Sequence, residues 1–372
     1  MPGEKIAIAI YFYRLGNLGG GAERRVCALA NTLCGYGLRV HVVTWDRPSM
    51  GSYYPLDDRV KWHRLGFKSG LIDKFRRIRV LADTLRRERV SVLVGFVMSG
   101  DKTVYAAAKL AGVRLVAAER NAPSMYYLRY TALQRWQYFT LLRLVDRIVV
   151  QFEDFSEGYP KGLQSRIVTI PNPVPRAERA AAPGRPNPAG RYTLLAVGRL
   201  DGVQKRLGCL IAAFGQVATD HPAWDMVVIG DGPEREALVR QAADCGIADR
   251  AKFDASRRDI FSAYADAQLF VIPSLWEGFP NALAEAMSHG LPAVGFAGAE
   301  GVSHLIDDGE SGWLAEGLDD AKALARTLDK AMAEHSERAR RGQLAVQAMA
   351  AYLPEALFLK WQDLIQELAR TR

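Results

Sequence analysis

Cysteine is scarce in this sequence, and long hydrophobic runs are missing from it. The 372 residues include four cysteines: Cys27, Cys34, Cys209 and Cys245. None of them is part of a Cys-x-x-Cys pair, and so few thiols cannot build a disulfide-stabilised scaffold, so a reducing cytoplasm fits best. The longest apolar runs, such as residues 90–98, are far shorter than the roughly 20 residues of a membrane-spanning helix. We therefore expect a cytoplasmic protein that does not cross a membrane.

The glycine motifs of two large classes of nucleotide-dependent enzyme are also missing. Neither residues 16–21 nor Gly230-Asp-Gly232 fits the Gly-x-Gly-x-x-Gly dinucleotide fingerprint, which disfavours a nicotinamide enzyme. No phosphate loop ends in Gly-Lys-Ser/Thr, which disfavours a kinase or ATPase. The six histidines show no metal-ligand spacing, so no metal site is predicted.

The overall composition is that of a globular protein with sizeable cores. Apolar residues make up 49% and charged residues 24%, and the length suits about two domains. Lysine and arginine exceed aspartate and glutamate, 49 against 41, which gives a formal net charge of +8. Such an excess suits phosphate-bearing or membrane-surface partners. No nucleic acid partner is expected.

Two series of alternating strand and helix patterns predict two doubly wound α/β domains with a cleft between them. Continuous apolar strands alternating with amphipathic helices indicate parallel sheets covered on both faces. Between the two series, the segment PNPVPRAERAAAPGRPNPAG contains six prolines and two glycines, which is typical of a semi-rigid linker. The predicted parts are an N-terminal domain (1–170), this linker (171–190), a C-terminal domain (191–350) and a C-terminal helix (351–372) that packs back on the N-terminal domain.

The strongest chemical signal is a pair of glutamates around a predicted helix start. Pro280 suits the first turn of a helix, which puts Glu277 in the preceding loop and Glu285 inside the helix. Backbone amides of residues 279–282 would then point out of the helix N-terminus, where a diphosphate is favoured. Glu285 has the chemistry to accept hydrogen bonds from a ribose, and Glu277 from a sugar beyond the phosphates. Taken alone, two such glutamates are more often an ordinary helix-entry acid and a solvated helix residue.

The wider sequence context resembles a known family. The run Trp276-Glu-Gly-Phe-Pro-Asn-Ala-Leu-Ala-Glu-Ala-Met-Ser-His-Gly-Leu-Pro-Ala-Val resembles the Glu-x7-Glu signature of family 4 glycosyltransferases, which are retaining enzymes of GT-B architecture. Three further segments agree with the family pattern in the expected order: Gly19-Gly-Gly-Ala-Glu-Arg24, Val197-Gly-Arg-Leu200 with Gln204-Lys205, and Val228-Ile-Gly-Asp-Gly-Pro-Glu234. The resemblance covers nearly the whole chain.

This resemblance implies a nucleotide-sugar donor, UDP- or GDP-linked, and no metal or other cofactor. Glu277, Arg199 and Lys205 would be the catalytic residues, with both cations holding the donor diphosphate; the chain has no Asp-x-Asp metal clamp. The expected donor-binding residues are Gly20, Gly21, Gly198, Gly278, Phe279, Pro280, Asn281, Ala282 and Glu285.

The sequence departs from the family pattern at two places. Many relatives carry a histidine facing the acceptor after the strand 115–118, where this chain has Glu119, Arg120 and Asn121. Only the acceptor-side position is therefore carried over to these three residues. Near Phe253, a glycine common in the base-binding loop is replaced by Ala255-Ser256, so the nucleobase contacts are not predicted.

The resulting hypothesis is a metal-independent hexosyltransferase that retains anomeric configuration and acts on a glycan or lipid-linked acceptor in polysaccharide biosynthesis. Two alternatives stay open: a sugar-nucleotide epimerase of the same architecture, and a non-catalytic nucleotide-sugar-binding protein. An epimerase would need no second substrate, and a silent binder would not need both Glu277 and Glu285.

Two basic stretches of the N-terminal domain predict peripheral contact with the inner face of a membrane. Residues 68–89 contain eight basic residues and three acids, with Arg76, Arg77 and Arg87 opposite an apolar stripe. Residues 126–147 interleave arginines with aromatic side chains, which suits a headgroup boundary. The alternative is that both stripes face the domain core and the arginines are solvated.

Overall fold

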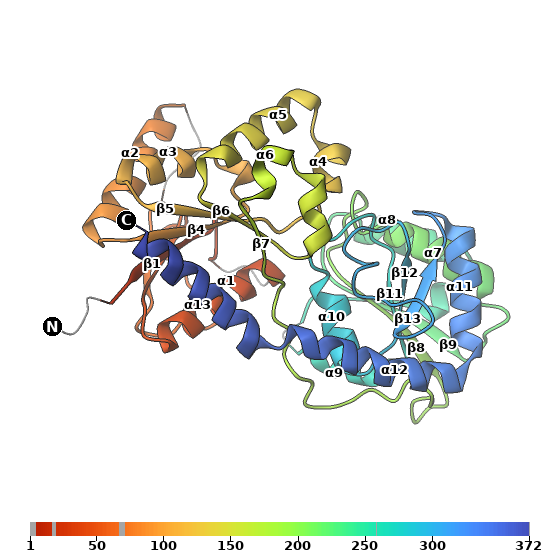
Figure 1. Cartoon of the computed structure of the whole chain (residues 1–372). Coiled ribbons are helices and arrows are strands. Elements are labelled where there is room, and N and C mark those ends of the chain that lie inside the picture. The colour runs from red at the N-terminus through yellow and green to blue at the C-terminus, as the bar shows by residue number, and fades with distance from the viewer. Residues whose placement is uncertain (1–4, 17–19, 67–70, 258, 372) are drawn as a thin grey trace. The chain divides into compact units, whose positions relative to one another are not determined.

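The computed structural model describes residues 5–16, 20–66, 71–257 and 259–371, and the chain divides into two compact units. The first unit consists of Met1–Asn172 with Glu355–Arg372, and the second is Pro173–Pro354. Each unit contains one parallel sheet with helices on its faces (Figure 1). Among the described residues, no helix is both long and apolar enough to cross a bilayer.

The first unit is built on a seven-stranded sheet in the order β3-β2-β1-β4-β5-β6-β7. Its strands are β1 (Ala7–Tyr11), β2 (Arg39–Thr44), β3 (Lys61–Arg64), β4 (Val92–Phe96), β5 (Arg114–Ala118), β6 (Arg147–Val150) and β7 (Ile167–Thr169). Its helices are α1 (Gly21–Gly35), α2 (Leu71–Arg87), α3 (Thr103–Ala111), α4 (Ser124–Arg129), α5 (Ala132–Leu141), α6 (Lys161–Gln164) and α13 (Pro354–Arg370). All strand pairs are parallel, as continuous apolar runs predict for a sheet buried on both faces.

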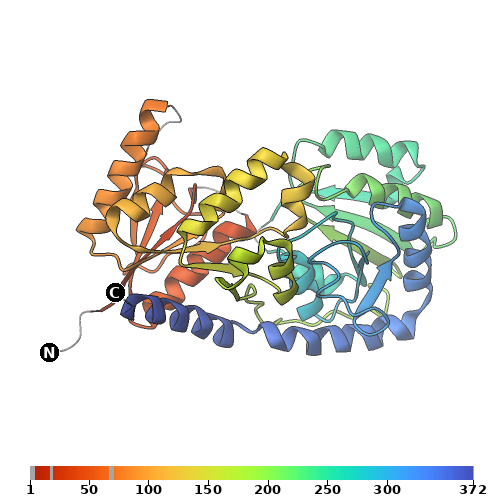
Figure 2. The same ribbon diagram turned by 45° about the horizontal axis from the view of Figure 1, so that its top comes forward.

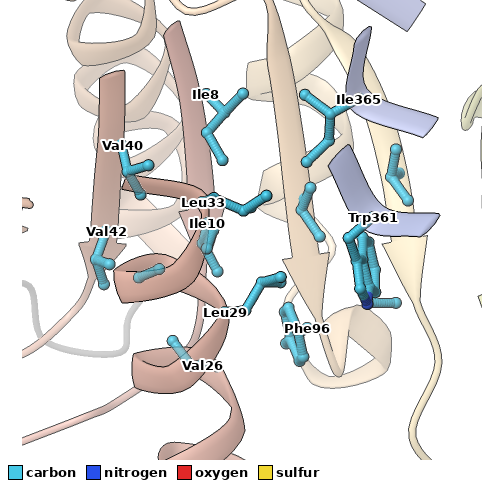
Figure 3. Packing of buried hydrophobic residues seen from close by; sticks show 14 of the residues in the cluster. Ile8, Ile10, Val26, Leu29, Leu33, Val40, Val42, Phe96, Trp361 and Ile365 are labelled. Atoms are coloured by element: carbon cyan, nitrogen blue, oxygen red, sulfur yellow. The ribbon is translucent and has the colours of Figure 1, made fainter. Parts of the chain in front are cut away.

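One face of this sheet is covered jointly by α1 and α13, which come from opposite ends of the chain (Figures 1 and 2). Figure 3 shows Leu29 and Leu33 of α1 and Trp361 and Ile365 of α13 in one cluster with strand residues. The ring of Trp361 stacks on Phe96, with centroids 6.3 Å apart, a contact worth about 1 kcal/mol beyond the buried area. The last helix is therefore part of the first unit's core.

The second unit is built on a six-stranded parallel sheet in the order β10-β9-β8-β11-β12-β13. Its strands are β8 (Tyr192–Val197), β9 (Trp224–Ile229), β10 (Ala251–Asp254), β11 (Leu269–Ile272), β12 (Ala293–Phe296) and β13 (Gly312–Ala315). Its helices are α7 (Leu207–Val217), α8 (Arg235–Asp244), α9 (Phe261–Asp266), α10 (Asn281–Ser288), α11 (Ala321–Ala333) and α12 (His335–Met349). Both sheets have a doubly wound order, in which the connections reverse direction beside the first strand.

The proline-rich segment predicted as a linker runs along the surface of the second unit. The amide of Ala181 donates to the carbonyl of His289 at 2.7 Å. The carbonyl of Pro183 accepts from the fully buried guanidinium of Arg338, which also donates to the end of α11. These bonds satisfy backbone groups of a segment that has no regular secondary structure of its own.

Candidate functional site

The candidate site lies where the second sheet reverses its winding. Strands β8 and β11 are neighbours, although the chain enters β9 and β10 between them. In open α/β sheets, ligands bind outside the carboxyl ends of the strands at such a switch point. The loops that leave these two ends are residues 198–206 and 273–280, and they carry the cations and the first glutamate predicted from the sequence.

Lys205 and Glu277 meet at this point, although 72 positions separate them in the sequence. The ammonium nitrogen of Lys205 lies 2.5 Å from Oε1 of Glu277, and the hydroxyl of Ser274 donates to the same oxygen at 2.7 Å. The two charged side chains are 19% and 8% exposed, so little water screens the pair. A buried ion pair is retained only with good geometry and further hydrogen bonds, and Ser274 supplies one of them.

Gln204 joins the two loops. Its side-chain NH2 group donates to the backbone carbonyl of Trp276 at 2.9 Å, and the backbone carbonyl of Gln204 accepts from the backbone amide of Leu275 at 2.9 Å. The side-chain nitrogen of Gln204 also lies 3.5 Å from Oε2 of Glu277. Sequence analysis did not assign a role to Gln204 or Ser274; the adjacency of Gln204 to Lys205 was the only signal for either.

The cations of the first loop differ in how they are held. The side chain of Arg199 is 71% exposed, lying 3.4 Å from Gln204 and 3.8 Å from Asp201. Arg206 donates to both carboxylate oxygens of Asp319 through Nε and one terminal nitrogen of its guanidinium, and this pairing raises the pKa of Arg206. Arg206 is thus engaged as a structural ion pair, whereas Arg199 projects from the carboxyl end of β8.

Glycines allow the loops around Glu277 to approach closely. A Cβ on Gly230 would lie 1.8 Å from the carbonyl oxygen of Gly198, so the loop after β9 packs directly on the loop after β8. A Cβ on Gly301 would lie 2.0 Å from the carbonyl oxygen of Glu277, and Gly301 has a positive φ of 85°. The backbone that carries Glu277 is therefore confined by a neighbouring loop that needs glycine.

Helix α10 follows this loop and presents its N-terminus to the same edge of the sheet. It begins at Asn281, so Pro280 is the capping residue rather than the first helical one. The preceding residues Gly278 and Phe279 are buried, and Asn281 and Ala282 are half-buried. The first amides of the helix thus lie beside Glu277, in an orientation that favours an anion.

Glu285 lies one turn inside α10 and is 3% exposed. The hydroxyl of Tyr264 donates to its Oε2 at 3.4 Å, which makes Tyr264 a neighbour that sequence analysis missed. Burial of a carboxylate requires hydrogen-bond partners, and vicinal hydroxyls of a ribose are partners of the required kind. The ribose-binding role of Glu285 stays a prediction.

In the first unit, the predicted donor-side glycines form the start of α1. Gly20 is the N-cap with extended backbone, and Gly21 is the first helical residue. Residues 17–19 of this glycine loop lie outside the described part of the chain. A Cβ on Gly20 would lie 2.2 Å from a carboxylate oxygen of Glu23, the acid in the first turn.

The three acceptor-side residues follow β5, again at a carboxyl end. Glu119 is buried and accepts hydrogen bonds from the hydroxyls of Tyr126 and Tyr138. Burial raises the pKa of Glu119 to about 7, against the opposing influence of Tyr138 and Arg120. Arg120 is half-buried, lies over the ring of Phe96, and donates to Asn172 at 2.9 Å; burial lowers its pKa to about 10.

The basic–aromatic stretches of the first unit are only partly on the surface. Arg77 was expected on the outer side of α2, but it is buried and forms an ion pair with Asp101, because the helix turns this position toward the sheet. Tyr126 and Tyr138 were expected at a headgroup boundary and are buried around Glu119. Residues 67–70, at the start of the first stretch, lie outside the described residues.

In the second stretch, a group of large apolar side chains on α4, α5 and the turn after α5 remains exposed, and we call it the α4–α5 face. Its members and their exposed fractions are Tyr127 (55%), Leu128 (58%), Leu133 (62%), Trp136 (65%) and Leu144 (52%). Arg129 and Arg143 are exposed beside them. Contiguous exposed apolar patches often mark interaction surfaces, which makes the α4–α5 face a candidate for one.

Comparison with protein families gives a match to each half of the chain. Residues 19–178 match the family described as Glycosyltransferase Family 4, and residues 191–334 match that described as Glycosyl transferases group 1. The two matches include Gly20 and Gly21 at the end of the glycine loop, both basic residues and both glutamates of the candidate site.

Curated relatives agree with these matches. An exopolysaccharide phosphotransferase of Streptomyces coelicolor is 27% identical over 61% of this chain, but the chain spans only 24% of that protein. An uncharacterized glycosyltransferase of Haemophilus influenzae is 23% identical over 83% of this chain and 86% of its own length. The lipopolysaccharide core biosynthesis glycosyltransferase LpsE of Rhizobium meliloti is 24% identical over 86% of this chain and 88% of its own length.

Solved structures share the fold over the full length. Sucrose-phosphate synthase of Thermosynechococcus elongatus superposes with a TM-score of 0.82 at 17% identity, covering 99% of this chain and 100% of that one. The Anabaena protein HepE, in complex with UDP and glucose, superposes with a TM-score of 0.77 at 16% identity. The match covers 97% of this chain and 100% of HepE. The two sheets thus have the GT-B arrangement of strands and helices.

Proposed function

Because the chain belongs to the family 4, group 1 glycosyltransferases, we propose that it transfers a hexose from a UDP-sugar to a glycan or lipid-linked acceptor with retention of anomeric configuration. The observation that carries this proposal is the constellation of Lys205, Glu277 and Ser274 at the switch point of the second sheet. It combines a cation for the diphosphate with a carboxylate oriented for the sugar.

The second unit has the groups that a diphosphate needs. Arg199 can match phosphate oxygens with two parallel hydrogen bonds, and Lys205 adds a compact positive charge. The N-terminus of α10 adds backbone N–H groups to the same edge. We expect these groups to stabilise the negative charge that develops on the departing diphosphate, which is the main contribution of such a site to the rate.

Glu277 is suited to hold the transferred sugar. Lys205, Ser274 and Gln204 fix its carboxylate, so it loses little conformational entropy when it accepts hydrogen bonds from sugar hydroxyls. Glu285, one turn further along α10, would bind the ribose. UDP is preferred over GDP in this proposal because HepE binds UDP in the same fold.

The acceptor is proposed to be an intermediate of surface-polysaccharide or lipopolysaccharide assembly. The support is the relative LpsE, which this chain matches over most of both lengths. Arg120 and Asn121, at the carboxyl end of β5, are half-buried and are the candidates for contacting the acceptor. The neighbouring Glu119 is buried and holds this segment through its hydrogen bond from Tyr126.

The α4–α5 face is proposed to hold the enzyme on an anionic membrane surface, where a lipid-linked acceptor would be found. Trp136 and Tyr127 suit the headgroup boundary, and Arg129 and Arg143 add attraction to anionic lipids. The guanidinium of Arg135 lies 4.3 Å from the ring centroid of Tyr127, which fixes that ring at the surface.

A panel of nucleotide sugars tests the proposed donor. Thermal unfolding should be measured with UDP-, GDP- and ADP-linked hexoses, because a ligand at 100 times its Kd stabilises the folded state by about 2.7 kcal/mol. We expect the largest shift with a UDP-sugar. Shifts with no member of the panel would contradict the proposal.

The same panel separates the transferase from its two alternatives. The donor alone, followed by NMR, should keep its sugar configuration; an epimerase would convert it without any acceptor. A non-catalytic binder would be stabilised by the donor but would release no UDP when crude lipid-linked acceptor is added.

A further inference from the structure

Three side chains with metal-binding atoms meet in the first unit, outside the candidate donor and acceptor residues. His41 lies on β2, His63 on β3, and Glu88 directly after α2. In the parallel β2–β3 pair, His41 is opposite Lys61, so His41, Lys61 and His63 project from the same face of the sheet. The C-terminal end of α2 brings Glu88 to this face.

The three potential ligand atoms are close together. Nδ1 of His41 lies 3.1 Å from Nε2 of His63 and 3.9 Å from Oε2 of Glu88. All three ligand atoms lie within 4.8 Å of one another. His41 is buried and the other two are half-buried, so the group is neither solvent-exposed nor sealed.

From this geometry we propose that His41, His63 and Glu88 form a zinc site, with one coordination position left for water. Zinc binds imidazole nitrogen at 2.0–2.1 Å and carboxylate oxygen at 2.0–2.2 Å, so two ligand atoms on a tetrahedral ion lie roughly 3.4 Å apart. The observed separations of 3.1 and 3.9 Å bracket that value. Two imidazoles with one carboxylate form a ligand set that zinc uses in proteins.

The two carboxylate oxygens of Glu88 have different partners, because Lys61 binds one of them. Its ammonium lies 2.6 Å from Oε1, while Oε2 is the oxygen on the histidine side. A cation that contacts the other oxygen of a metal-ligating carboxylate orients that carboxylate, in the way that hydrogen bonds orient ligating histidines. The same atoms also form one histidine–histidine hydrogen bond and one ion pair that need no metal. The experiment must therefore distinguish a zinc site from these two contacts alone.

A zinc ion here would fasten the edge of the first sheet. Among the described residues, β3 is the edge strand of this sheet and pairs with β2 alone, and its side chains are exposed or half-buried. The ion would tie β3 to β2 and to the end of α2, so its binding should raise the stability of the folded state by mass action. Sequence spacing could not indicate it, because the ligands lie 22 and 25 positions apart on three different elements.

Zinc binding to the full chain tests the proposal. The protein is treated with EDTA, freed of chelator, and titrated with ZnCl2 in a calorimeter. We expect one zinc ion per chain, with affinity reduced at least tenfold in His63→Ala and in Glu88→Gln. His221→Ala is the matched control, because His221 pairs with Asp329 at 2.7 Å but belongs to no group of three potential metal ligands among the described residues.

Metal-free thermal unfolding identifies any variant that does not fold. If His63→Ala is not folded, Glu88→Gln decides, since it keeps the shape of the side chain and both imidazoles. Cobalt substitution gives an independent signal, because a tetrahedral Co2+ site with two imidazoles absorbs visible light. Absence of zinc binding by the wild type, or equal binding by the wild type and both ligand variants, would overturn the proposal.

Discussion

At the residue scale, the charge of Glu277 is matched by Lys205 rather than by water. The distance of 2.5 Å and the low exposure of both groups make this a strongly coupled pair. A diphosphate bound at the switch point would compete for the ammonium, and the carboxylate would then accept hydrogen bonds from sugar hydroxyls. The ion pair therefore allows both charged side chains to be buried at the site, where either one alone would destabilise the folded state.

Replacing Glu277 with glutamine should separate catalysis from nucleotide binding. We expect Glu277→Gln to lower turnover by at least 100-fold, because a charged acceptor aimed at the sugar is lost. UDP affinity should be unchanged or higher, since Lys205 loses its counterion. Transfer rates and calorimetric UDP titration measure the two effects, with Glu316→Gln, on the exposed surface of the same unit, as control. Transfer at the wild-type rate would remove Glu277 from the site.

The buried carboxyl of Glu119 makes stability depend on pH. Its folded-state pKa is raised to about 7 from 4.5, so the folded protein keeps a proton that the unfolded chain releases between these values. Stability should therefore fall as pH rises from about 4.5 to 7, by on the order of 3 kcal/mol. Urea unfolding at pH 5 and pH 8 should show a smaller decline for Glu119→Gln than for the wild type. Identical declines would contradict the raised pKa.

Sequence analysis found Lys205 and Glu277 because both lie in recognisable motifs, but it could not place them in contact. Their meeting depends on β8 and β11 being neighbours in the sheet, which is a tertiary fact. It also expected Arg77 on the surface; helical spacing alone does not tell which face of α2 meets the sheet, and Asp101, the partner of Arg77, lies on a separate segment.

At the element scale, the carboxyl ends of β8 and β11 and the N-terminus of α10 converge on one edge of the sheet. This arrangement offers a diphosphate two cations and the positive end of a helix. The close approach of the loops needs Gly230 and Gly301, where any Cβ would overlap a carbonyl oxygen.

Transfer should therefore proceed without a divalent cation at the diphosphate. We expect excess EDTA to leave the rate within about twofold of its initial value, because Arg199, Lys205 and α10 balance the charge. The rate is measured as UDP release with and without chelator. Complete loss of activity that magnesium restores would contradict this expectation; a change that only zinc restores would instead concern the site around His41.

Most central strands and helices could be predicted, because they are apolar runs or have clear periodicity. The strand expected at 115–118, for example, is β5, which begins one residue earlier. The four edge strands β3, β7, β10 and β13 were missed, since strands of three or four residues are too short to show a clear alternation. α12 was missed because its buried face includes Arg338 and Arg341, which a hydrophobic pattern does not reveal.

At the scale of the whole molecule, both units repeat one design, a parallel sheet wound in both directions from its first strand. Two such sheets were predicted from the alternation of elements and from the family resemblance, and they are confirmed. The last helix of the chain returns to the first unit, since α13 contributes Trp361 and Ile365 to that unit's core. An amphipathic helix fits any apolar face, so its sequence pattern alone does not identify its partner.

The α4–α5 face predicts salt-dependent membrane binding. The full chain should co-sediment with phosphatidylglycerol vesicles in low salt and be released at high salt, because the attraction decays within a Debye length of about 10 Å. Each arginine near the surface contributes about 1 kcal/mol, so Arg129→Glu with Arg143→Glu should weaken binding at least tenfold. Arg240→Glu, exposed on the second unit, is the control. Failure to co-sediment in low salt would make a soluble acceptor the better proposal.

The central claim is that the switch point of the second sheet binds the donor diphosphate through Lys205. Calorimetric titration of UDP into the wild type, Lys205→Ala and Lys252→Ala tests it most directly, because Lys252 is an exposed lysine of the same unit. We predict binding by the wild type and Lys252→Ala, and at least a tenfold loss of affinity in Lys205→Ala. Equal affinity of Lys205→Ala and the wild type for UDP would contradict the assignment of this site.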